Sequence, residues 1–245
     1  MSPEFITISY QGIVLKTFSP NLDMSVLYDS FNEPITEIDC GVVCAPHNPN
    51  GVPFCCDICY AVPAAYQQEW RYLRAQTDLW HVWQGDECVG GTEDPEDLKS
   101  ITPEHMILLA CKGVDHCQRM FRAMSCRQFP FFPYITEDHR FLGMAYEWAF
   151  ENTCWVISNL GTVREVYWRG FIALYDSLLA IWPDEHESYA IYSKDMREVF
   201  AAKKWRIPIL HRNGGYYLLS PGSERLVKAT PQEFRKFGPY ANFVR

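Results

Sequence analysis

The distribution of cysteine constrains the fold of this 245-residue chain more than any other feature. Ten cysteines are present, and eight of them fall in two short segments, five from Cys40 to Cys59 and three from Cys111 to Cys126. Thiolates a few residues apart in a bent segment can reach one metal centre, and soft thiolates select zinc, copper(I) or iron–sulfur clusters over magnesium or calcium. The two segments therefore predict a metal site that joins distant parts of the chain.

The amino terminus indicates the compartment. No basic segment followed by an apolar run is present at the start, and no apolar stretch reaches about 18 residues. We therefore expect a cytoplasmic protein that is not held in a membrane. Cytosolic thiols are kept reduced, which favours metal ligands or catalytic groups over disulfides. Cys88 and Cys154 stand alone in the sequence, and for them we expect the role of small buried hydrophobic residues.

Composition and charge exclude some classes of protein. The chain is 48% hydrophobic, enough for a substantial core, and its net charge of −8 argues against a nucleic-acid-binding surface along the whole chain. Residues 196–245 nevertheless carry ten Lys and Arg against three Asp and Glu. This basic region could dock a protein or peptide partner, or it could compensate the acidic remainder of the same chain.

Residue periodicity predicts the elements of the first half. Alternation of apolar and polar groups near residues 5–10 predicts a hairpin or an extended arm. An apolar stripe predicts a helix over residues 64–83, and the acidic residues 84–104 predict a solvated loop. Pro130 and Pro133 exclude a helix in the segment between them.

The second half has stronger signals. A long helix is predicted over residues 164–182, ending at Pro183, and another over 193–204 with Ser193 as its N-cap. Asn213 and Gly214 predict the turn of a β-hairpin over residues 207–219. The predicted class is α+β, helix-rich, with an irregular cysteine core and a few short strands. A cysteine-rich metal-binding region, residues 1–135, is expected to pack as one unit with a helical region, residues 136–245.

Eight cysteines are candidate ligands. Four thiolates can hold either tetrahedral zinc or a [4Fe–4S] cluster, and neither the zinc-ribbon spacing nor the ferredoxin spacing is met in full. Because one cluster needs four ligands, either some candidates are structural or a second metal is bound. The candidates are Cys40, Cys44, Cys55, Cys56, Cys59, Cys111, Cys117 and Cys126.

Polar neighbours of these cysteines are candidates for supporting roles. His116 could orient the site or hydrogen-bond to it, and Arg122 and Arg127 could bond to sulfur or neutralise thiolate charge. Ordinary salt bridges are the alternative for the two arginines. Asp57 is expected to lie beside the ligands or to be exposed. No Ser-His-Asp set, P-loop, dinucleotide fingerprint or HExxH motif is present, so the catalytic residues are unknown.

The cysteine pattern resembles the CxxCxxCC (YkgJ-like) family of zinc- or iron-chelating proteins. Cys40 and Cys44 match its leading pair, although their spacing is CxxxC, and Cys55-Cys56 match its double cysteine after an insert of ten residues. Cys111 and Cys117 precede a segment, residues 122–130, that is similar to the family's terminal signature, with Ala123 in place of its usual proline. Cys59 is additional. The resemblance covers about residues 36–133.

The resemblance implies a metal site, often an iron–sulfur cluster. Our first hypothesis is a [4Fe–4S] protein that serves in redox chemistry or in the modification of a partner or peptide. The first alternative is a zinc-stapled structural or interaction module without catalysis. The second is an enzyme similar to the flagellin lysine N-methylases, which carry a similar cysteine set. Absorption near 400 nm would distinguish a cluster from zinc, and binding of S-adenosylmethionine would test the methylase.

Overall fold

The computed structural model describes residues 6–10, 13–17, 23–88 and 95–241, and the fold is α+β, as predicted. Its helices are α1 (Met24–Ser30), α2 (Cys40–Cys44), α3 (Gln67–Gln76), α4 (Pro95–Ile101), α5 (Met124–Gln128), α6 (Trp155–Ser158), α7 (Glu165–Ile181) and α8 (Pro183–Ala202). Its strands are β1 (Ile6–Tyr10), β2 (Ile13–Thr17), β3 (Ala64–Tyr66), β4 (Trp80–Val82), β5 (Met106–Cys111), β6 (Phe131–Ile135), β7 (Phe141–Tyr146), β8 (Ile207–His211), β9 (Tyr216–Leu219) and β10 (Leu226–Ala229). In the part of the chain described, no helix is long and apolar enough to cross a membrane.

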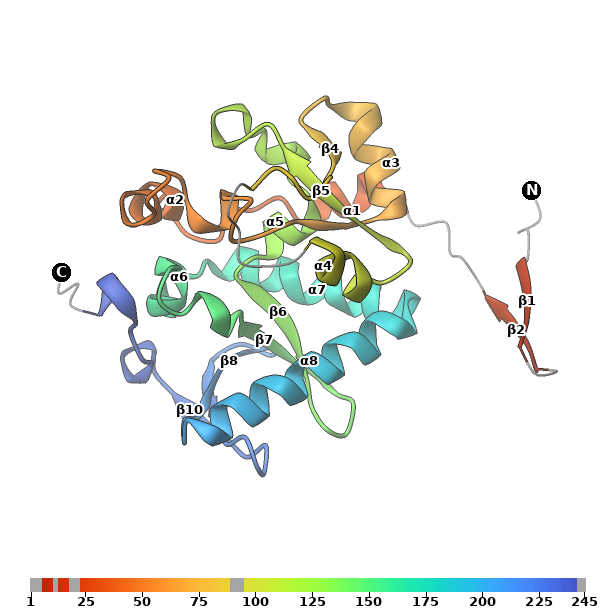
Figure 1. The fold of residues 1–245 in the computed structure, drawn as a ribbon. Helices are drawn as coiled ribbons and strands as arrows, with labels where there is room; N and C mark the ends of the chain where they lie inside the picture. Colours follow the sequence, from red (N-terminus) through yellow and green to blue (C-terminus); the bar gives the residue numbers. More distant parts are fainter. Residues whose placement is uncertain (1–5, 11–12, 18–22, 89–94, 242–245) are drawn as a thin grey trace.

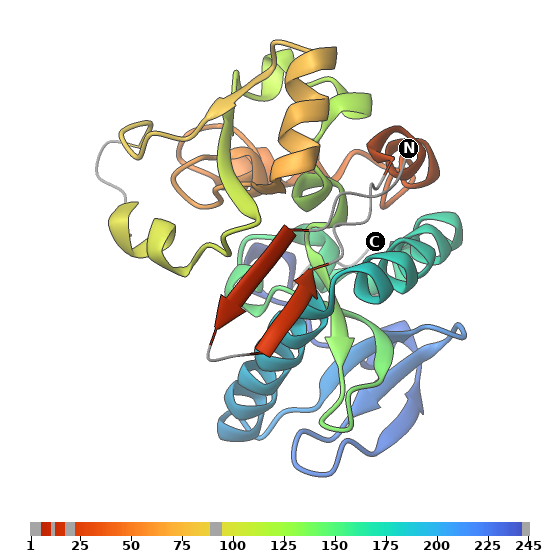
Figure 2. The same ribbon diagram turned by 90° about the vertical axis from the view of Figure 1, so that its right-hand side faces the viewer.

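A five-stranded antiparallel sheet organises the second half of the chain. Its strand order is β10-β9-β8-β7-β6, and α7 and α8 lie on its opposite faces (Figures 1 and 2). Side chains alternate between the two faces of a strand. On β6, Phe131 accordingly contacts Tyr167 of α7, while its neighbour Phe132 contacts Tyr192 of α8. Because both faces are covered, every residue of β6 and β7 is buried.

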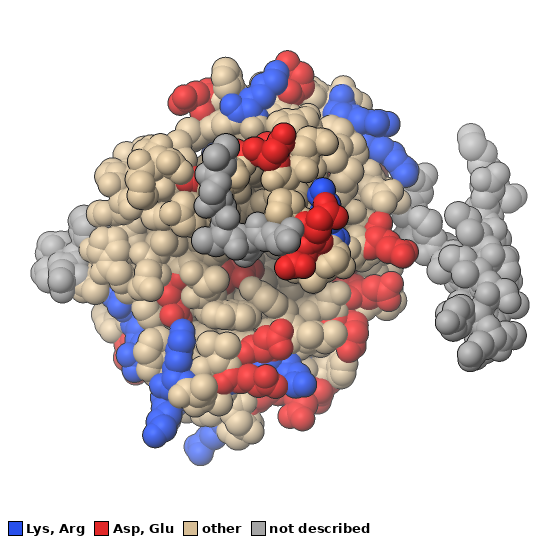
Figure 3. Space-filling model, viewed as in Figure 1, with Lys and Arg blue, Asp and Glu red and all other residues tan. Residues whose placement is uncertain are grey.

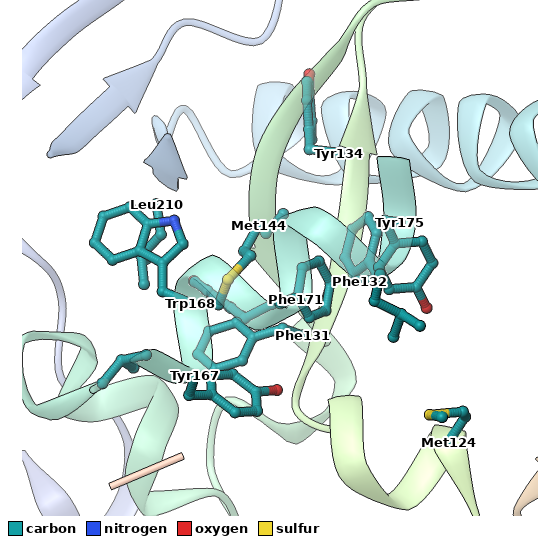
Figure 4. Packing of buried hydrophobic residues seen from close by; sticks show 14 of the residues in the cluster. Met124, Phe131, Phe132, Tyr134, Met144, Tyr167, Trp168, Phe171, Tyr175 and Leu210 are labelled. Carbon is teal, nitrogen blue, oxygen red and sulfur yellow. The ribbon is translucent and has the colours of Figure 1, made fainter. Parts of the chain in front are cut away.

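Aromatic side chains of α7 fill the space beneath this sheet. Tyr167, Phe171 and Tyr175 are spaced four residues apart, so they lie along one face of the helix. Phe171 packs against both neighbours, with ring centroids 6.5 Å and 4.6 Å away. Figure 4 shows Phe131 and Met144 beside these rings. The helix is therefore fixed to the sheet by burial of large apolar groups.

A smaller sheet belongs to the cysteine-rich half. Its order is β3-β5-β4, and the antiparallel register places Trp80 of β4 opposite Cys111 at the end of β5. The expected boundary at residues 135/136 falls at the end of β6, whose partner β7 lies beyond it. Both expected regions therefore contribute strands to the larger sheet.

Two predictions for residues 64–104 are wrong. The predicted helix over 64–83 is divided into β3, α3 and β4, because Tyr66 and Thr77 have extended backbones on either side of α3. The predicted acidic loop contains α4, where Pro95 begins the helix and acidic residues occupy the first turn. Proline and acidic groups both favour a helix amino terminus. Residues 89–94 of that loop lie outside the described part.

In the second half, α7 confirms the predicted helix over 164–182, but the next helix begins ten residues earlier than predicted. Pro183 occupies the first turn of α8, where its missing N–H costs no hydrogen bond. Ser193 is not an N-cap. It is buried within α8, and its hydroxyl oxygen accepts the Ile135 N–H at 2.9 Å. The predicted C-terminal hairpin is confirmed as β8–β9, and β10 adds a third strand. The predicted N-terminal hairpin is also confirmed, as β1–β2.

Charge is distributed unevenly over the surface seen in Figure 3. Lysine and arginine side chains gather at the lower left, over β10 and the end of α8, while acidic side chains gather over the beginning of α8. The face over α2 is largely uncharged. The sequence explains this, since Asp57 is the single charged residue between Cys40 and Tyr66.

Candidate metal centre

Two cysteines form a disulfide and eight are free. Cys59 is bonded to Cys88, with an S–S distance of 1.98 Å and a Cα–Cα distance of 5.1 Å. A disulfide sulfur offers no thiolate, so Cys59 differs here from its predicted role as a ligand, and Cys88 from that of an isolated buried thiol. The eight free cysteines are Cys40, Cys44, Cys55, Cys56, Cys111, Cys117, Cys126 and Cys154.

One cavity collects cysteines from both sequence segments. It has a volume of about 270 Å³ and opens among residues 52–63, β4, the end of β5 and α5. Apolar side chains, including Leu79, Trp80 and Ile58, form much of its wall. The cysteines that line it are Cys55, Cys56, Cys111, Cys117 and Cys126. The two cysteine segments therefore meet at this cavity through these five residues.

The small sheet positions Cys111 and Cys117. Cys111 ends β5, and the chain then turns at Gly113, whose φ of 95° suits glycine, before a 3₁₀ turn leads to Cys117. Trp80 ties the following loop to the sheet, because its indole N–H donates to the Phe121 carbonyl at 2.7 Å. The strand end and the loop thus hold the two sulfurs on one side of the cavity.

Helix α5 carries Cys126 and is held by Arg127. The guanidinium of Arg127 donates at 2.7 Å to both the Tyr28 and Phe31 carbonyls at the end of α1, and at 2.6 Å to the Met120 carbonyl. Its Nε donates to the Arg122 carbonyl at 3.1 Å. Arg127 was predicted to bond to sulfur or to form salt bridges, but these contacts go to backbone oxygens and position α5.

A buried carboxylate, Glu69, supports the same helix. It accepts the Met124 N–H at 2.6 Å, the Tyr28 hydroxyl at 2.7 Å and the Tyr66 N–H at 3.2 Å. Burial raises the pKa of Glu69, although these donors oppose the shift. Nothing in the local sequence distinguishes this glutamate from its exposed neighbours, since all three partners come from other segments or from backbone.

Asp57 holds the turn that carries Cys55 and Cys56. It is buried, and its carboxylate accepts the side-chain amides of Asn48 and Asn50, both at 2.9 Å, and the Cys59 N–H at 3.1 Å. Burial disfavours the charge, but these hydrogen bonds outweigh it and lower the pKa. Its role is to close the loop around the two cysteines.

Arg122 contacts a cysteine sulfur directly, as predicted. Its Nε donates to the Cys117 Sγ at 3.0 Å. Burial opposes the charge of this guanidinium, but the bond to Cys117 and attraction to the Cys117, Cys56 and Cys126 sulfurs together outweigh it and raise the pKa. His116, which was predicted to orient the site or to hydrogen-bond to it, is instead exposed.

Sulfur atoms in the cavity shift the pKa values of neighbouring cysteines. Burial, and then repulsion from Cys56, Cys111 and Cys117, raises the pKa of Cys126. Burial also raises the pKa of Cys111. In contrast, a hydrogen bond from Cys55, assisted by Arg122, lowers the pKa of Cys56 to about 7. These sulfurs, together with that of Cys55, therefore form one electrostatic group.

The remaining free cysteines, Cys40, Cys44 and Cys154, do not line this cavity. Cys40 and Cys44 are on α2, which packs against α6, and the Trp155 N–H donates to the Cys44 Sγ at 3.4 Å. Cys154, the residue before Trp155, is buried in the apolar core, as predicted.

Comparison with known proteins does not add to this picture, since no family model, curated protein or solved structure matches the chain. The resemblance to the CxxCxxCC family remains a prediction. Across the described residues, no group of three or more His, Cys, Asp or Glu side chains is arranged to hold a metal ion. The centre must therefore be judged from its thiols and its cavity.

Proposed function

We propose that this chain is an iron–sulfur protein whose [4Fe–4S] cluster is held by Cys56, Cys111, Cys117 and Cys126. The observation that carries the proposal is the convergence of these four free cysteines, from three separate segments, on one cavity. Four free thiols are the donor set that such a cluster takes. Packing alone gives no reason for four thiols that repel one another when ionised to be gathered in this way.

The size of the cavity favours a cluster over the zinc alternative. A tetrahedral zinc ion with Zn–S bonds of about 2.3 Å needs its sulfurs ~3.8 Å apart. In a [4Fe–4S] cluster each thiolate binds a different iron, so the ligand sulfurs stand farther apart around a larger space. The cavity of about 270 Å³ provides such a space.

The surrounding residues suit a negatively charged group shielded from water. Arg122 places a positive charge against the Cys117 sulfur, and Trp80 and Leu79 line the cavity with apolar surface. Hydrogen bonds and burial of this kind tune the potential of a cluster. A bound [4Fe–4S] cluster supplies one-electron chemistry, which fits a role in redox reactions or in modification of a partner or peptide.

The test is metal analysis of the whole chain purified without oxygen. Iron, sulfide, zinc and absorption near 400 nm are measured for the wild type and for Cys117→Ser and Cys126→Ser. We expect each variant to lose about four irons and four sulfides, the content of one cubane. The double variant Cys59→Ser/Cys88→Ser is the matched control, because it removes two cysteines outside the group, and it should keep its iron.

Two results would overturn the proposal. In the first, folded Cys117→Ser and Cys126→Ser proteins keep the iron of the wild type. In the second, the wild type is colourless and holds zinc that both variants lose, which would establish the zinc-stapled module instead. If the variants do not fold, the iron and sulfide content of the wild type still decides between these readings.

A further inference from the structure

A second cavity lies against the proposed metal centre. It has a volume of about 270 Å³, and its wall consists of residues 34–40 together with Arg119, Arg122, Cys126 and Arg127. We call it the arginine cavity. Two of these residues, Arg122 and Cys126, also line the cysteine cavity. The two cavities therefore share a wall, and that wall contains a proposed cluster ligand.

The three arginines of this cavity differ in how far their donors are used. Arg127 is fully engaged, because its guanidinium donates to four backbone carbonyls. Arg119 and Arg122 each use Nε, which donates to the Asn32 carbonyl at 3.2 Å and to the Cys117 Sγ at 3.0 Å respectively. Within the described part of the chain, neither hydrogen-bonds through its Nη nitrogens or pairs with a carboxylate. Two guanidinium groups thus bring unused donors to one cavity.

The carboxylates in and beside the arginine cavity are already occupied. Arg164 donates to Glu33 through Nη1 at 2.9 Å and to Glu37 through Nε at 2.8 Å. Asp39 accepts a backbone N–H at 2.9 Å, as the N-cap of α2. Glu37 and Asp39 line the cavity, but their nearest partners are these donors. The two arginines are therefore left without a counter-ion of their own.

A carboxylate matches the free donors. The planar guanidinium presents paired N–H groups whose spacing fits the two oxygens of a carboxylate. Pro34, Ile35 and Ile38 add apolar surface to the same wall, and such surface suits a carbon skeleton rather than an inorganic ion. We infer that the arginine cavity binds a small organic carboxylate, whose oxygens accept hydrogen bonds from Arg119 and Arg122.

The inference deepens the proposed function, and it rests on that function for the role of the ligand. With a cluster on Cys126, the carboxylate lies across the shared wall from it and is the class of substrate that the redox centre recognises. An anion beside Arg122 offsets its positive charge, which disfavours the more negative, reduced cluster. Because such coupling is reciprocal, the carboxylate should bind the oxidised protein more tightly than the reduced protein.

Binding of butyrate and benzoate to the whole chain, followed by ligand-detected NMR, tests the site. We expect Arg119→Gln to weaken binding about fivefold, because one of two guanidinium groups is lost. Arg119 is exposed and its Nε bonds to a carbonyl rather than to sulfur, so this variant should fold and keep the iron of the wild type. Arg140→Gln, at an exposed site that pairs with Asp138, is the matched control and should bind both acids as the wild type does.

Two further probes test the class of ligand. Butyramide has the shape of butyrate without its charge, and it should not bind. Inorganic phosphate has the charge without an apolar part, and it should bind more weakly than either acid. Phosphate that binds more tightly than both acids, or butyramide that binds as well as butyrate, would overturn the assignment to a carboxylate.

Redox titration with and without butyrate tests the link to the cluster. We expect butyrate to bind the reduced protein about fivefold more weakly, which lowers the reduction potential by about 40 mV for one electron. In Arg119→Gln, at the same concentration of butyrate, this shift should be smaller. An iron-loaded wild type that binds butyrate without any shift would overturn the coupling.

The outcomes separate the carboxylate site from the cluster. A wild type that binds neither acid, or binds them no more tightly than folded Arg119→Gln, would overturn the site and leave the cluster. Binding that Arg119→Gln weakens, in a wild type that contains no iron, would support the site and overturn the cluster.

Discussion

The sheet half of the molecule and the cysteine half are held together by different interactions. From β6 onward, long helices cover both faces of a sheet, and large rings such as Phe171 and Tyr167 are buried between them. Before β6, helices of five to ten residues and 3₁₀ turns are joined by buried polar groups, with Glu69 and Arg127 bonded to distant backbone. Helices this short are marginal without tertiary support.

This difference indicates what the cysteine half lacks. Most residues of the buried apolar core lie from β6 onward, whereas the cysteine half places seven of the eight free cysteines at and between its short elements. Metal–thiolate bonds can supply folding free energy where a core is small. Each prediction below tests whether the two halves depend on different forces.

Removal of the metal should have the largest effect, and it should be confined to one half. We expect a chelator, after oxidative loss of the proposed cluster, to abolish amide protection in residues 52–63 and 106–126, because the linked turns lose their common anchor. Strands β6–β9 should keep their protection. Hydrogen exchange followed by mass spectrometry measures both regions, and equal loss in both halves would contradict the comparison.

Phe171→Ala should destabilise the sheet half. This ring is fully buried between α7 and the sheet, so its loss should lower the free energy of unfolding by about 3–5 kcal/mol. Denaturation followed by tryptophan fluorescence measures the change, and absorption near 400 nm should be unaltered before unfolding. Val166→Ala is the control, because Val166 is 46% exposed on the same helix, and it should cost less than ~0.5 kcal/mol.

The stability of the sheet half should fall as pH rises between the unfolded and folded pKa values of Glu147. Burial raises the pKa of Glu147 from 4.5 to about 7, although the Tyr192 hydroxyl opposes this shift. The folded chain then binds more protons than the unfolded chain, so stability is fully present below pH 4.5 and is lost as pH approaches 7. The loss is on the order of 1–3 kcal/mol.

Denaturation at several pH values tests this dependence. In Glu147→Gln the difference between pH 4.5 and pH 7.5 should shrink by that amount. An unchanged profile would show that another group is responsible.

Arg122→Gln should have the smallest effect, and only on the proposed centre. Loss of the positive charge beside Cys117 disfavours the more negative, reduced cluster. The reduction potential should fall by about 40 mV, which is ~1 kcal/mol for one electron. Redox titration measures the shift. Arg140→Gln, at an exposed site that pairs with Asp138, should leave the potential unchanged.

The sequence predicted the sheet half better than the cysteine half. The period of α7 and the Asn213-Gly214 turn are local signals, and the structure has both elements. The division of residues 64–83 was missed, because the extended backbone of Tyr66 depends on pairing with β5, which is distant in sequence. A local sequence pattern contains no information about a strand that pairs from a distant segment.

The candidate site shows the same limit. The two segments could be recognised from the concentration of cysteine in the sequence, and five of their cysteines line one cavity. The expected burial of Cys154 is confirmed, but the partner of Cys59 was missed because Cys88 lies 29 residues away. The role of Arg127 was missed because its partners are backbone carbonyls. Every residue carries such a carbonyl, so the sequence does not indicate which ones a side chain will contact.

The most direct test of the central claim is the iron, sulfide and zinc content of the wild-type chain purified without oxygen, with its absorption spectrum. The account predicts a brown protein in which iron and sulfide are equal and present in multiples of four per chain, with little zinc. A folded, colourless protein that contains neither iron nor zinc and retains eight free thiols would contradict it.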